Sequence, residues 1–470
     1  MSGPGTKERP LRVAVIGSGP AGFYSVQALL REGSPSVEID MFDRLPTPFG
    51  LVRYGVAPDH PKIKNVTAVY DKLASHPGFR FYGNVEYGTD LDRDDLERHY
   101  HQVVFATGAP SDRRLGIPGE DLRGSHPATE FVAWFNGHPD FTDHLFDLDC
   151  ERAVVIGVGN VAVDVARILC RTAEELAATD IADQALDTLR SSRIREVYLL
   201  GRRGPAQAKF TTPEVRELGE LADTETTTVE SEVQLDPLSR EVLETEGDRA
   251  TVRKVTMLQQ WSRQPSSGKS RHLRLRFLVS PTEILADDRG RVGGVRITRN
   301  ILARDASGYL QATATDETEL LDCGIVFRSV GYRGVALPCL PYDERRGVLP
   351  NDKGRLIDPS SSSPLPGMYT SGWIKRGPSG IIGTNKPDAV ETVRSMFEDL
   401  QAGRLASAAP PPRAALEATL RERRVRFVTY PDWQRLDALE IERGKAAGRP
   451  RVKMTRREQM LAALGDGGGP

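Results

Sequence analysis

The chain has 470 residues, which is too long for one hydrophobic core and predicts two or more domains. Its 63 basic and 65 acidic residues leave a formal net charge of −2, so bulk nucleic-acid binding is not indicated. The four cysteines form no CxxC pair, which argues against a zinc knuckle or a redox dithiol and favours a reducing compartment. Neither an apolar signal segment nor a run of about 18 apolar residues occurs, so we expect a cytoplasmic protein without membrane insertion.

The first predicted unit is a strand over residues 11–16, a glycine turn over 17–22, a helix over 23–33 and a strand over 37–42. In the turn, Gly17 permits the tight bend, Gly19 lets the backbone approach a pyrophosphate, and Gly22 lets the helix pack on the strand. The helix N-terminus favours the anion. Asp43 ends the next strand, where a carboxylate accepts hydrogen bonds from a ribose diol. A dinucleotide site is therefore predicted, with a ligand-free structural turn as the alternative. The Gly-Pro-Ala-Gly variant resembles flavoproteins, which favours FAD.

The pattern restarts at a strand over 153–156, followed by a second turn, Gly157-Val158-Gly159-Asn160-Val161-Ala162. The next strand, over 196–200, ends in Gly201-Arg202-Arg203-Gly204. An NAD site calls for an acid at this position, whereas guanidinium groups suit the 2′-phosphate of NADP(H). The second turn is therefore predicted to bind NADPH/NADP+, and a merely solvated pair of arginines is the alternative interpretation.

The remaining chain gives coarser predictions. An extra helical stretch over 172–190 lengthens the second crossover, and residues 224–325 look β-rich, with strand candidates at 254–260, 273–279 and 294–299. A buried strand over 103–106 and another over 325–330 are expected on the flavin side. A strand over 367–373 enters a glycine-rich turn, a helix covers 388–399, and a Pro/Ala-rich linker over 406–415 precedes a charged helical tail.

Three longer segments carry a resemblance: PFGLVRYGVAPDHP at 48–61, GRRGPAQAKFT at 201–211 and GWIKRGPSGIIGTN at 372–385. Together with the two glycine turns they resemble the adrenodoxin reductase-type ferredoxin–NADP reductases, particularly the bacterial members. The resemblance implies an α/β fold of two three-layer, Rossmann-like nucleotide-binding domains, with the NADP domain inserted into a discontinuous FAD domain. The expected boundaries are 1–110 and 325–470 for the FAD domain, the latter with the helical tail, and 111–324 for the NADP domain.

The resemblance also implies site residues. Beside the turn glycines Gly17, Gly19 and Gly22, the FAD contacts fall on Ala21, Asp43, Leu51, Val85, Trp373, Gly380, Ile381 and Ile382. The NADP contacts fall on Gly157, Val158, Gly159, Asn160, Val161, Arg202, Arg203, Glu214 and Gly380. Asp43 stands where family members commonly have Glu, which gives a shorter reach.

By the same resemblance, NADPH gives a hydride to the flavin, and the reduced flavin passes single electrons to a ferredoxin that serves cytochrome P450 or other ferredoxin-dependent enzymes. Cofactors carry this chemistry, so no metal ligand set is expected. Trp373 is expected to place the nicotinamide, and His60 and Glu214 to form a proton relay; core packing, a structural histidine and a solvated acid are the alternatives.

The chain has no cysteine cluster for an iron–sulfur centre, so the expected acceptor is a separate ferredoxin. Because ferredoxins are usually acidic, the docking candidates are the basic residues Lys209, Arg216, Lys375 and Arg376, with ordinary solvated charges as the alternative. A disulfide reductase is disfavoured because residues 43–65 lack cysteine. An NADPH diaphorase or quinone reductase with a small-molecule acceptor, and a non-enzymatic binding protein, stay as alternatives.

Overall fold

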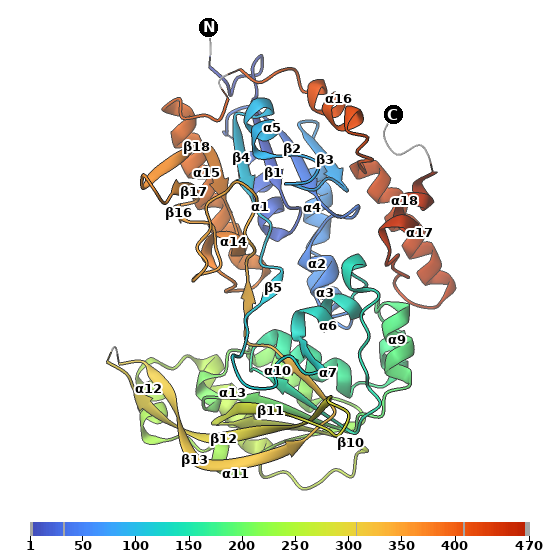
Figure 1. Cartoon of the computed structure of the whole chain (residues 1–470), viewed down its shortest axis with the longest axis vertical. Helices are drawn as coiled ribbons and strands as arrows, with labels where there is room; N and C mark the ends of the chain where they lie inside the picture. Colours follow the sequence, from blue (N-terminus) through green and yellow to red (C-terminus); the bar gives the residue numbers. More distant parts are fainter. Residues whose placement is uncertain (1–2, 32, 307, 408, 466–470) are drawn as a thin grey trace. The chain divides into compact units, whose positions relative to one another are not determined.

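The computed structural model describes residues 3–31, 33–306, 308–407 and 409–465. The chain divides into two compact units (Figure 1). The first comprises Met1–Val56, His60–Ser111 and Gly331–Pro470, and the second comprises Ala57–Asp59 and Asp112–Val330. The second unit is thus an insertion in the sequence of the first. No helix among the described residues is long and apolar enough to cross a membrane.

A seven-stranded sheet, in the order β16-β17-β18-β4-β1-β2-β3, forms the centre of the first unit. The strands from β18 to β3 pair in parallel, and β16 and β17 add an antiparallel edge. The strand bounds are β1 Leu11–Ile16, β2 Val37–Asp43, β3 Phe79–Gly83, β4 Gln102–Phe105, β16 Asn351–Asp352, β17 Arg355–Asp358 and β18 Ser363–Thr370.

Helices cover both faces of this sheet. Successive residues of its strands point to opposite faces, and the residues on each face are apolar, so both faces must be buried. Along β1, Val13 and Val15 face a core that includes residues of α1, α15 and α17, whereas Ala14 and Ile16 face a core that includes residues of α5 and α16. The helices are α1 Pro20–Leu29, α2 Leu51–Tyr54, α3 Pro61–Lys64, α4 Thr67–Ala74, α5 Arg93–His99, α14 Trp373–Arg376, η3 Ile382–Thr384, α15 Asn385–Gln401, α16 Ala414–Glu422, α17 Tyr430–Ala446 and α18 Arg457–Leu464. The linker predicted over 406–415 includes residue 408, which lies outside the described residues.

The second unit has a parallel six-stranded sheet in the order β6-β14-β7-β8-β10-β9. Helices pack on one face, where Ala153 and Val155 of β7 point, and the antiparallel sheet β11-β12-β13 packs on the other, where Val154 and Ile156 point. The strand bounds are β6 Ser125–Pro127, β7 Arg152–Ile156, β8 Glu196–Gly201, β9 Thr224–Thr228, β10 Arg271–Phe277, β11 Val279–Ala286, β12 Val292–Arg304, β13 Leu310–Asp322 and β14 Ile325–Arg328.

The helices of the second unit are α6 Ala128–Phe135, η1 Pro139–Phe141, α7 Asn160–Cys170, α8 Ala173–Ala177, α9 Asp183–Arg190, η2 Pro205–Gln207, α10 Thr212–Gly219, α11 Glu230–Val233, α12 Pro237–Glu246 and α13 Arg249–Trp261. A two-stranded sheet pairs β5 Ser111–Asp112 with β15 Tyr332–Arg333. The α/β class with two three-layer units, one inserted into the other, confirms the predicted fold class.

The strand predicted over 325–330 belongs to a different sheet from the one expected. The sequence predicts this strand on the flavin side, but β14 pairs in parallel with β7 and β6 of the second unit. In the second sheet β14 lies beside β7, just as β4 lies beside β1 in the first sheet. In each sheet the residue after this strand, Ala106 or Ser329, puts its carbonyl oxygen against the first glycine of the turn, Gly17 or Gly157. A short apolar strand carries no information about which sheet it completes.

Residues 254–260 are helical, although the sequence predicts a strand for them. They lie in helix α13, whose N-cap Asp248 accepts a hydrogen bond from the backbone N–H of Thr251. Val255, Leu258 and Trp261 are buried along one helical face. This spacing of three is typical of a helix. The other candidates, 273–279 and 294–299, overlap β10 and β12.

The first unit also contains a histidine whose titration is coupled to folding. His101 is buried, and its Nδ1 accepts a hydrogen bond of 2.9 Å from the backbone N–H of Arg12. Burial, aided by the charge of Arg12, lowers the pKa of His101 to about 4. In the unfolded chain the imidazole of His101 is protonated near pH 6.5. In the folded protein the same group is protonated only near pH 4.

We predict that this histidine destabilises the protein as the pH falls from 7 towards 4, by on the order of 3 kcal/mol at the lower end. The His101→Gln variant lacks this titration. The amount by which its free energy of unfolding falls below that of the wild type should therefore shrink as the pH is lowered. Urea unfolding at several pH values measures this. A deficit that stays constant from pH 7 to pH 5 would contradict the coupling.

Candidate functional site

The first glycine turn follows β1 and opens α1. Gly17 has φ +106°, and a Cβ there would lie 2.5 Å from the carbonyl oxygen of Ala106. A Cβ on Gly22 would lie 2.1 Å from the carbonyl oxygen of Gly17. At Gly19, by contrast, the nearest atom to such a Cβ is the Cα of Gly50, 4.0 Å away. The outer glycines are thus needed for packing, and the middle one leaves the open backbone that a pyrophosphate requires.

Asp43 lies directly beside this turn. Its carboxylate accepts hydrogen bonds from the backbone N–H of Ser18 at 3.0 Å, from the Ser18 hydroxyl, and from the backbone N–H of Leu45 at 2.9 Å. The backbone N–H of the buried Val85 donates to the Asp43 carbonyl at 2.9 Å. The structure therefore brings the predicted residues of β1, β2 and the segment after β3 to one edge of the sheet.

The predicted contact residue Leu51 opens α2, and Gly50 before it lies against Gly19. The same short helix contains Arg53, a residue that the sequence pattern did not single out. Its guanidinium is buried and makes a two-pronged ion pair with Glu440 of α17, at 2.9 and 2.6 Å. Burial alone lowers the pKa of Arg53, but the charge of Glu440 raises it above its usual value. The helical tail thereby anchors the segment beside the first turn.

The glycine-rich segment around Trp373 lies against the same turn. A Cβ on Gly372 would lie 2.4 Å from the Cβ of Ala21, so these two predicted regions are adjacent. The carboxylate of Asp388 accepts from the backbone N–H of Gly372 at 2.6 Å, which fixes the start of α14. Trp373 is half-buried, with its ring centre 5.1 Å from that of Tyr332.

The end of the glycine-rich segment remains accessible. Gly380 and Ile381 are exposed and Ile382 opens η3. The predicted FAD residues of the first unit thus come from distant parts of the sequence, and Asp43, Gly50 before Leu51, and Gly372 before Trp373 lie against the first turn.

The second glycine turn repeats this geometry in the second unit. Gly157 has φ +134°, and a Cβ there would lie 2.1 Å from the carbonyl oxygen of Ser329. At Gly159, no heavy atom of the described residues outside its chain neighbours lies within 4 Å of such a Cβ. The backbone carbonyl of Val158 accepts hydrogen bonds of 2.9 Å from the N–H groups of Lys209 and Phe210, which ties the turn to the segment after β8. This cradle also fits a dinucleotide.

The two arginines lie at the end of β8, the strand next to β7. Arg202 is exposed and Arg203 is partly buried. The oxygen of the Asn160 side chain accepts from the backbone N–H of Thr211 at 2.9 Å, just before α10. Glu214 stands in the first turn of α10, 3.7 Å from the guanidinium of the buried Arg167. The structure therefore groups the predicted NADP residues of this unit at one edge of its sheet.

The remaining predictions have mixed outcomes. His60 is half-buried at the start of α3, in the first unit. Lys209 and Arg216 are exposed, whereas Arg376 is partly buried and its guanidinium donates to the Ser379 carbonyl at 3.1 Å. Lys375 was wrongly included among the docking candidates. It is 5% exposed, and its Nζ contacts Asp388 at 3.1 Å and Glu391 at 2.8 Å, so its charge is neutralised within the unit.

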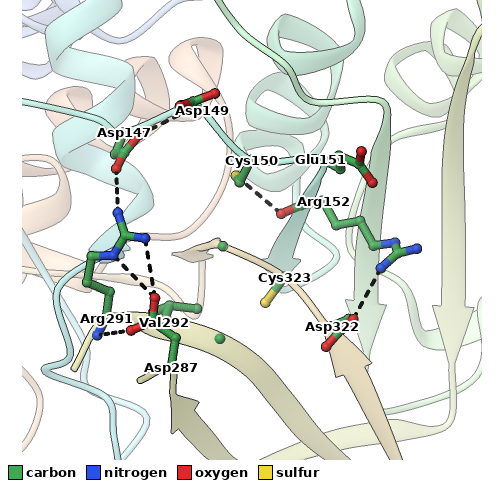
Figure 2. A pocket seen from close by; sticks show the side chains of 12 residues that line it. Asp147, Asp149, Cys150, Glu151, Arg152, Asp287, Arg291, Val292, Asp322 and Cys323 are labelled. Atoms are coloured by element: carbon green, nitrogen blue, oxygen red, sulfur yellow. Dashed lines mark hydrogen bonds and ion pairs between the residues drawn. The ribbon is translucent and has the colours of Figure 1, made fainter. Parts of the chain in front are cut away.

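A pocket of about 290 Å³ in the second unit lies away from the glycine turn (Figure 2). It is lined by the segments just before β7 and β14, which are the amino ends of these strands, whereas the turn follows the carboxyl end of β7. Its arginines are paired with acids, Arg291 with Asp147 at 3.1 Å and Arg152 with Asp322 at 3.4 Å. Nucleotides bind at the carboxyl ends of parallel strands, so this pocket is not the nucleotide site.

Two cysteines in Figure 2 line this pocket. Burial raises the pKa of the Cys150 thiol to about 11 and that of the Cys323 thiol to about 12. Both are therefore neutral thiols at physiological pH, with little nucleophilic character.

Two sheets, each with parallel strands and a glycine turn open to a pyrophosphate, have the geometry expected of a two-nucleotide oxidoreductase. The pyridine nucleotide-disulphide oxidoreductase family matches residues 11–201. A probable ferredoxin/ferredoxin–NADP reductase of Mycobacterium tuberculosis strain H37Rv is 45% identical over 97% of this chain and 76% of its own length. The mitochondrial NADPH:adrenodoxin oxidoreductase of Arabidopsis thaliana is 42% identical over 97% of this chain and 95% of its own length.

A solved structure supports the same relationship. Mycobacterium tuberculosis FprA in complex with NADPH is 43% identical, covers 97% of this chain and 100% of its own, and superposes with a TM-score of 0.90. The chain belongs to the adrenodoxin reductase-type ferredoxin–NADP reductases, as its motifs indicated.

We predict that alanine at one glycine of the second turn weakens NADP+ binding, whereas alanine at the other lowers stability. Gly159→Ala should leave the melting temperature nearly unchanged, because its Cβ meets open space, but should weaken NADP+ binding at least tenfold by occupying the approach to the pyrophosphate. Gly157→Ala should destabilise the protein itself, because its Cβ meets the Ser329 carbonyl. Thermal unfolding and NADP+ titration separate the two. Unchanged NADP+ affinity in Gly159→Ala would contradict the assignment of this turn.

Loss of the buried ion pair should be costly. Glu440→Ala leaves the Arg53 charge buried without its partner, and we expect the free energy of unfolding to fall by about 3–5 kcal/mol. The matched control Glu97→Ala removes a partly exposed pair with Arg93, and should cost less than about 1 kcal/mol. Urea unfolding measures both. Equal losses in the two variants would show that Glu440 does not anchor α2.

Proposed function

We propose that this chain is an FAD-dependent NADPH:ferredoxin oxidoreductase, in which electrons pass from NADPH through FAD to a separate iron–sulfur ferredoxin. The observation that carries the proposal is the difference between two otherwise equivalent turns. The first is bordered by the carboxylate of Asp43 and the second by the guanidinium groups of Arg202 and Arg203. Family membership supports the same activity.

The first unit holds FAD in this proposal. Its contacts are the turn glycines with Ala21, Asp43, Leu51, Val85, Trp373, Gly380, Ile381 and Ile382. The chemistry that FAD would supply when bound is acceptance of a hydride and release of single electrons. The residues of the chain supply binding and orientation. Asp43, already held in place by the Ser18 and Leu45 N–H groups, keeps acceptor capacity for a ribose hydroxyl.

The second unit holds NADPH, with the boundary strand β14 included in it, so the proposed NADP domain extends to residue 330 rather than 324. Its contacts are residues 157–161, Arg202, Arg203 and Glu214, with Gly380 added from the first unit. A carboxylate at the end of β8 would repel a 2′-phosphate, whereas two guanidinium groups attract it. We assign nicotinamide placement to Trp373 and proton transfer to His60 and Glu214.

The electron acceptor in this proposal is an acidic ferredoxin. Lys209, Arg216 and Arg376 are the proposed docking residues, without the buried Lys375. Supply of electrons to cytochrome P450 or to other ferredoxin-dependent enzymes follows the same proposal. We also propose a cytoplasmic location, supported by four cysteines that are all free thiols.

The test is a stopped-flow experiment on the purified protein. We expect a yellow protein whose flavin absorbance bleaches with anaerobic NADPH at least 100 times faster than with NADH, because only NADPH has the 2′-phosphate. A [2Fe–2S] ferredoxin should then be reduced, and that second step should slow steeply as salt rises from 50 to about 300 mM if charges steer docking. Equal rates with NADH, or a ferredoxin that stays oxidised, would refute the proposed function.

A further inference from the structure

A long hairpin of the second unit reaches the turn that contains the two arginines. β12 and β13 pair antiparallel over most of their length (Figure 1). On β12 the buried Asn300 donates from its side-chain nitrogen to the Arg202 carbonyl at 2.8 Å. The backbone N–H of Leu278, just before β11, donates to the Arg203 carbonyl at 3.2 Å. The antiparallel sheet thus fixes the backbone that carries both guanidinium groups.

The end of this hairpin also contacts one of the two side chains. The Arg203 guanidinium donates to the hydroxyl of Tyr309 and lies with its central carbon 5.2 Å from the centre of the tyrosine ring. Tyr309 is held in turn by Asp305, which accepts from its backbone N–H at 3.0 Å. An ion pair of 3.0 Å between Arg304 and Glu241 fastens the hairpin to α12. Within the described part of the chain, the side chain of Arg202 has no comparable partner.

A guanidinium can contact a tyrosine and bind a phosphate at the same time. The Tyr309 hydroxyl takes one of the five N–H groups of Arg203, and the ring lies within cation–π distance of the guanidinium carbon. The other N–H groups, on the edge of the plane, stay available for bidentate bonds to a phosphate. A long exposed arginine otherwise loses side-chain entropy when it binds, so a partner that restrains it beforehand strengthens binding.

We propose that Tyr309 is a specificity-determining residue for NADP(H): it restrains Arg203 in the orientation that binds the 2′-phosphate. The proposal rests on the proposed function, because it presumes that the second turn binds NADP(H). It adds a residue from a distant hairpin to the recognition of the phosphate. Tyr309 acts through Arg203 and is therefore a positioning residue.

Calorimetric titration of the flavoprotein with 2′,5′-ADP and with 5′-AMP tests this, because the two probes differ only in the 2′-phosphate. Tyr309→Ala should weaken 2′,5′-ADP binding about three- to tenfold and leave 5′-AMP binding unchanged. Tyr309→Phe keeps the ring and should lose less. Leu320→Ala is the matched control: Leu320 is 55% exposed on the same hairpin, as is Tyr309, and its loss should change neither affinity.

The Arg203→Ala background distinguishes the possible failures. If Tyr309 acts through Arg203, adding Tyr309→Ala to Arg203→Ala should cause no further loss of 2′,5′-ADP affinity. Wild-type affinity in Tyr309→Ala, or the same loss in both backgrounds, would overturn the role of Tyr309 while Arg203→Ala still weakens binding. If Arg203→Ala itself leaves 2′,5′-ADP binding unchanged, the proposed NADP site falls, and the role of Tyr309 with it.

Discussion

In both units a backbone carbonyl oxygen lies where the Cβ of the first residue of the glycine turn would be. The carbonyl of Ala106 lies against Gly17, and the carbonyl of Ser329 lies against Gly157. Each comes from the residue that follows the neighbouring parallel strand, β4 or β14. This contact lets strand, turn and helix come close enough for the turn to expose its backbone N–H groups. The proposed nucleotide sites depend on it, because a side chain at either position would push the turn away from the strand.

The two glycine turns are built alike, and they differ in the charge at the end of the strand that follows each helix. β2 ends in Asp43, and β8 is followed by Arg202 and Arg203. Each charged group is braced by its surroundings. Asp43 is held by backbone N–H groups of the first turn, and the backbone of the arginines is held by Asn300 and Leu278. The proposed direction of electron flow, from the second unit to the first, follows from this difference in charge.

Much of the site is supported by segments far away in the sequence. Arg53, two residues after Leu51, pairs with Glu440 near the end of the chain. Gly372, beside Trp373, is fixed by Asp388 and touches Ala21. Such contacts explain why the helical tail belongs to the first unit. Burying Arg53 and Glu440 together is tolerable because they pair with each other, and Glu440 also accepts from the backbone N–H of Met454 at 2.8 Å.

The sequence alone determined both glycine turns, their strand and helix neighbours, the acid after the first and the arginines after the second. These features are local: a glycine that needs open backbone, or a residue at the end of a strand, is visible within about 50 residues. The tertiary structure alone decided that the strand Ile325–Arg328 completes the second sheet and that Lys375 is buried. It also decided that Arg53 finds Glu440 and that Tyr309 lies against Arg203. A strand or a charged residue has the same local pattern whatever its partner, and only packing between distant segments selects that partner.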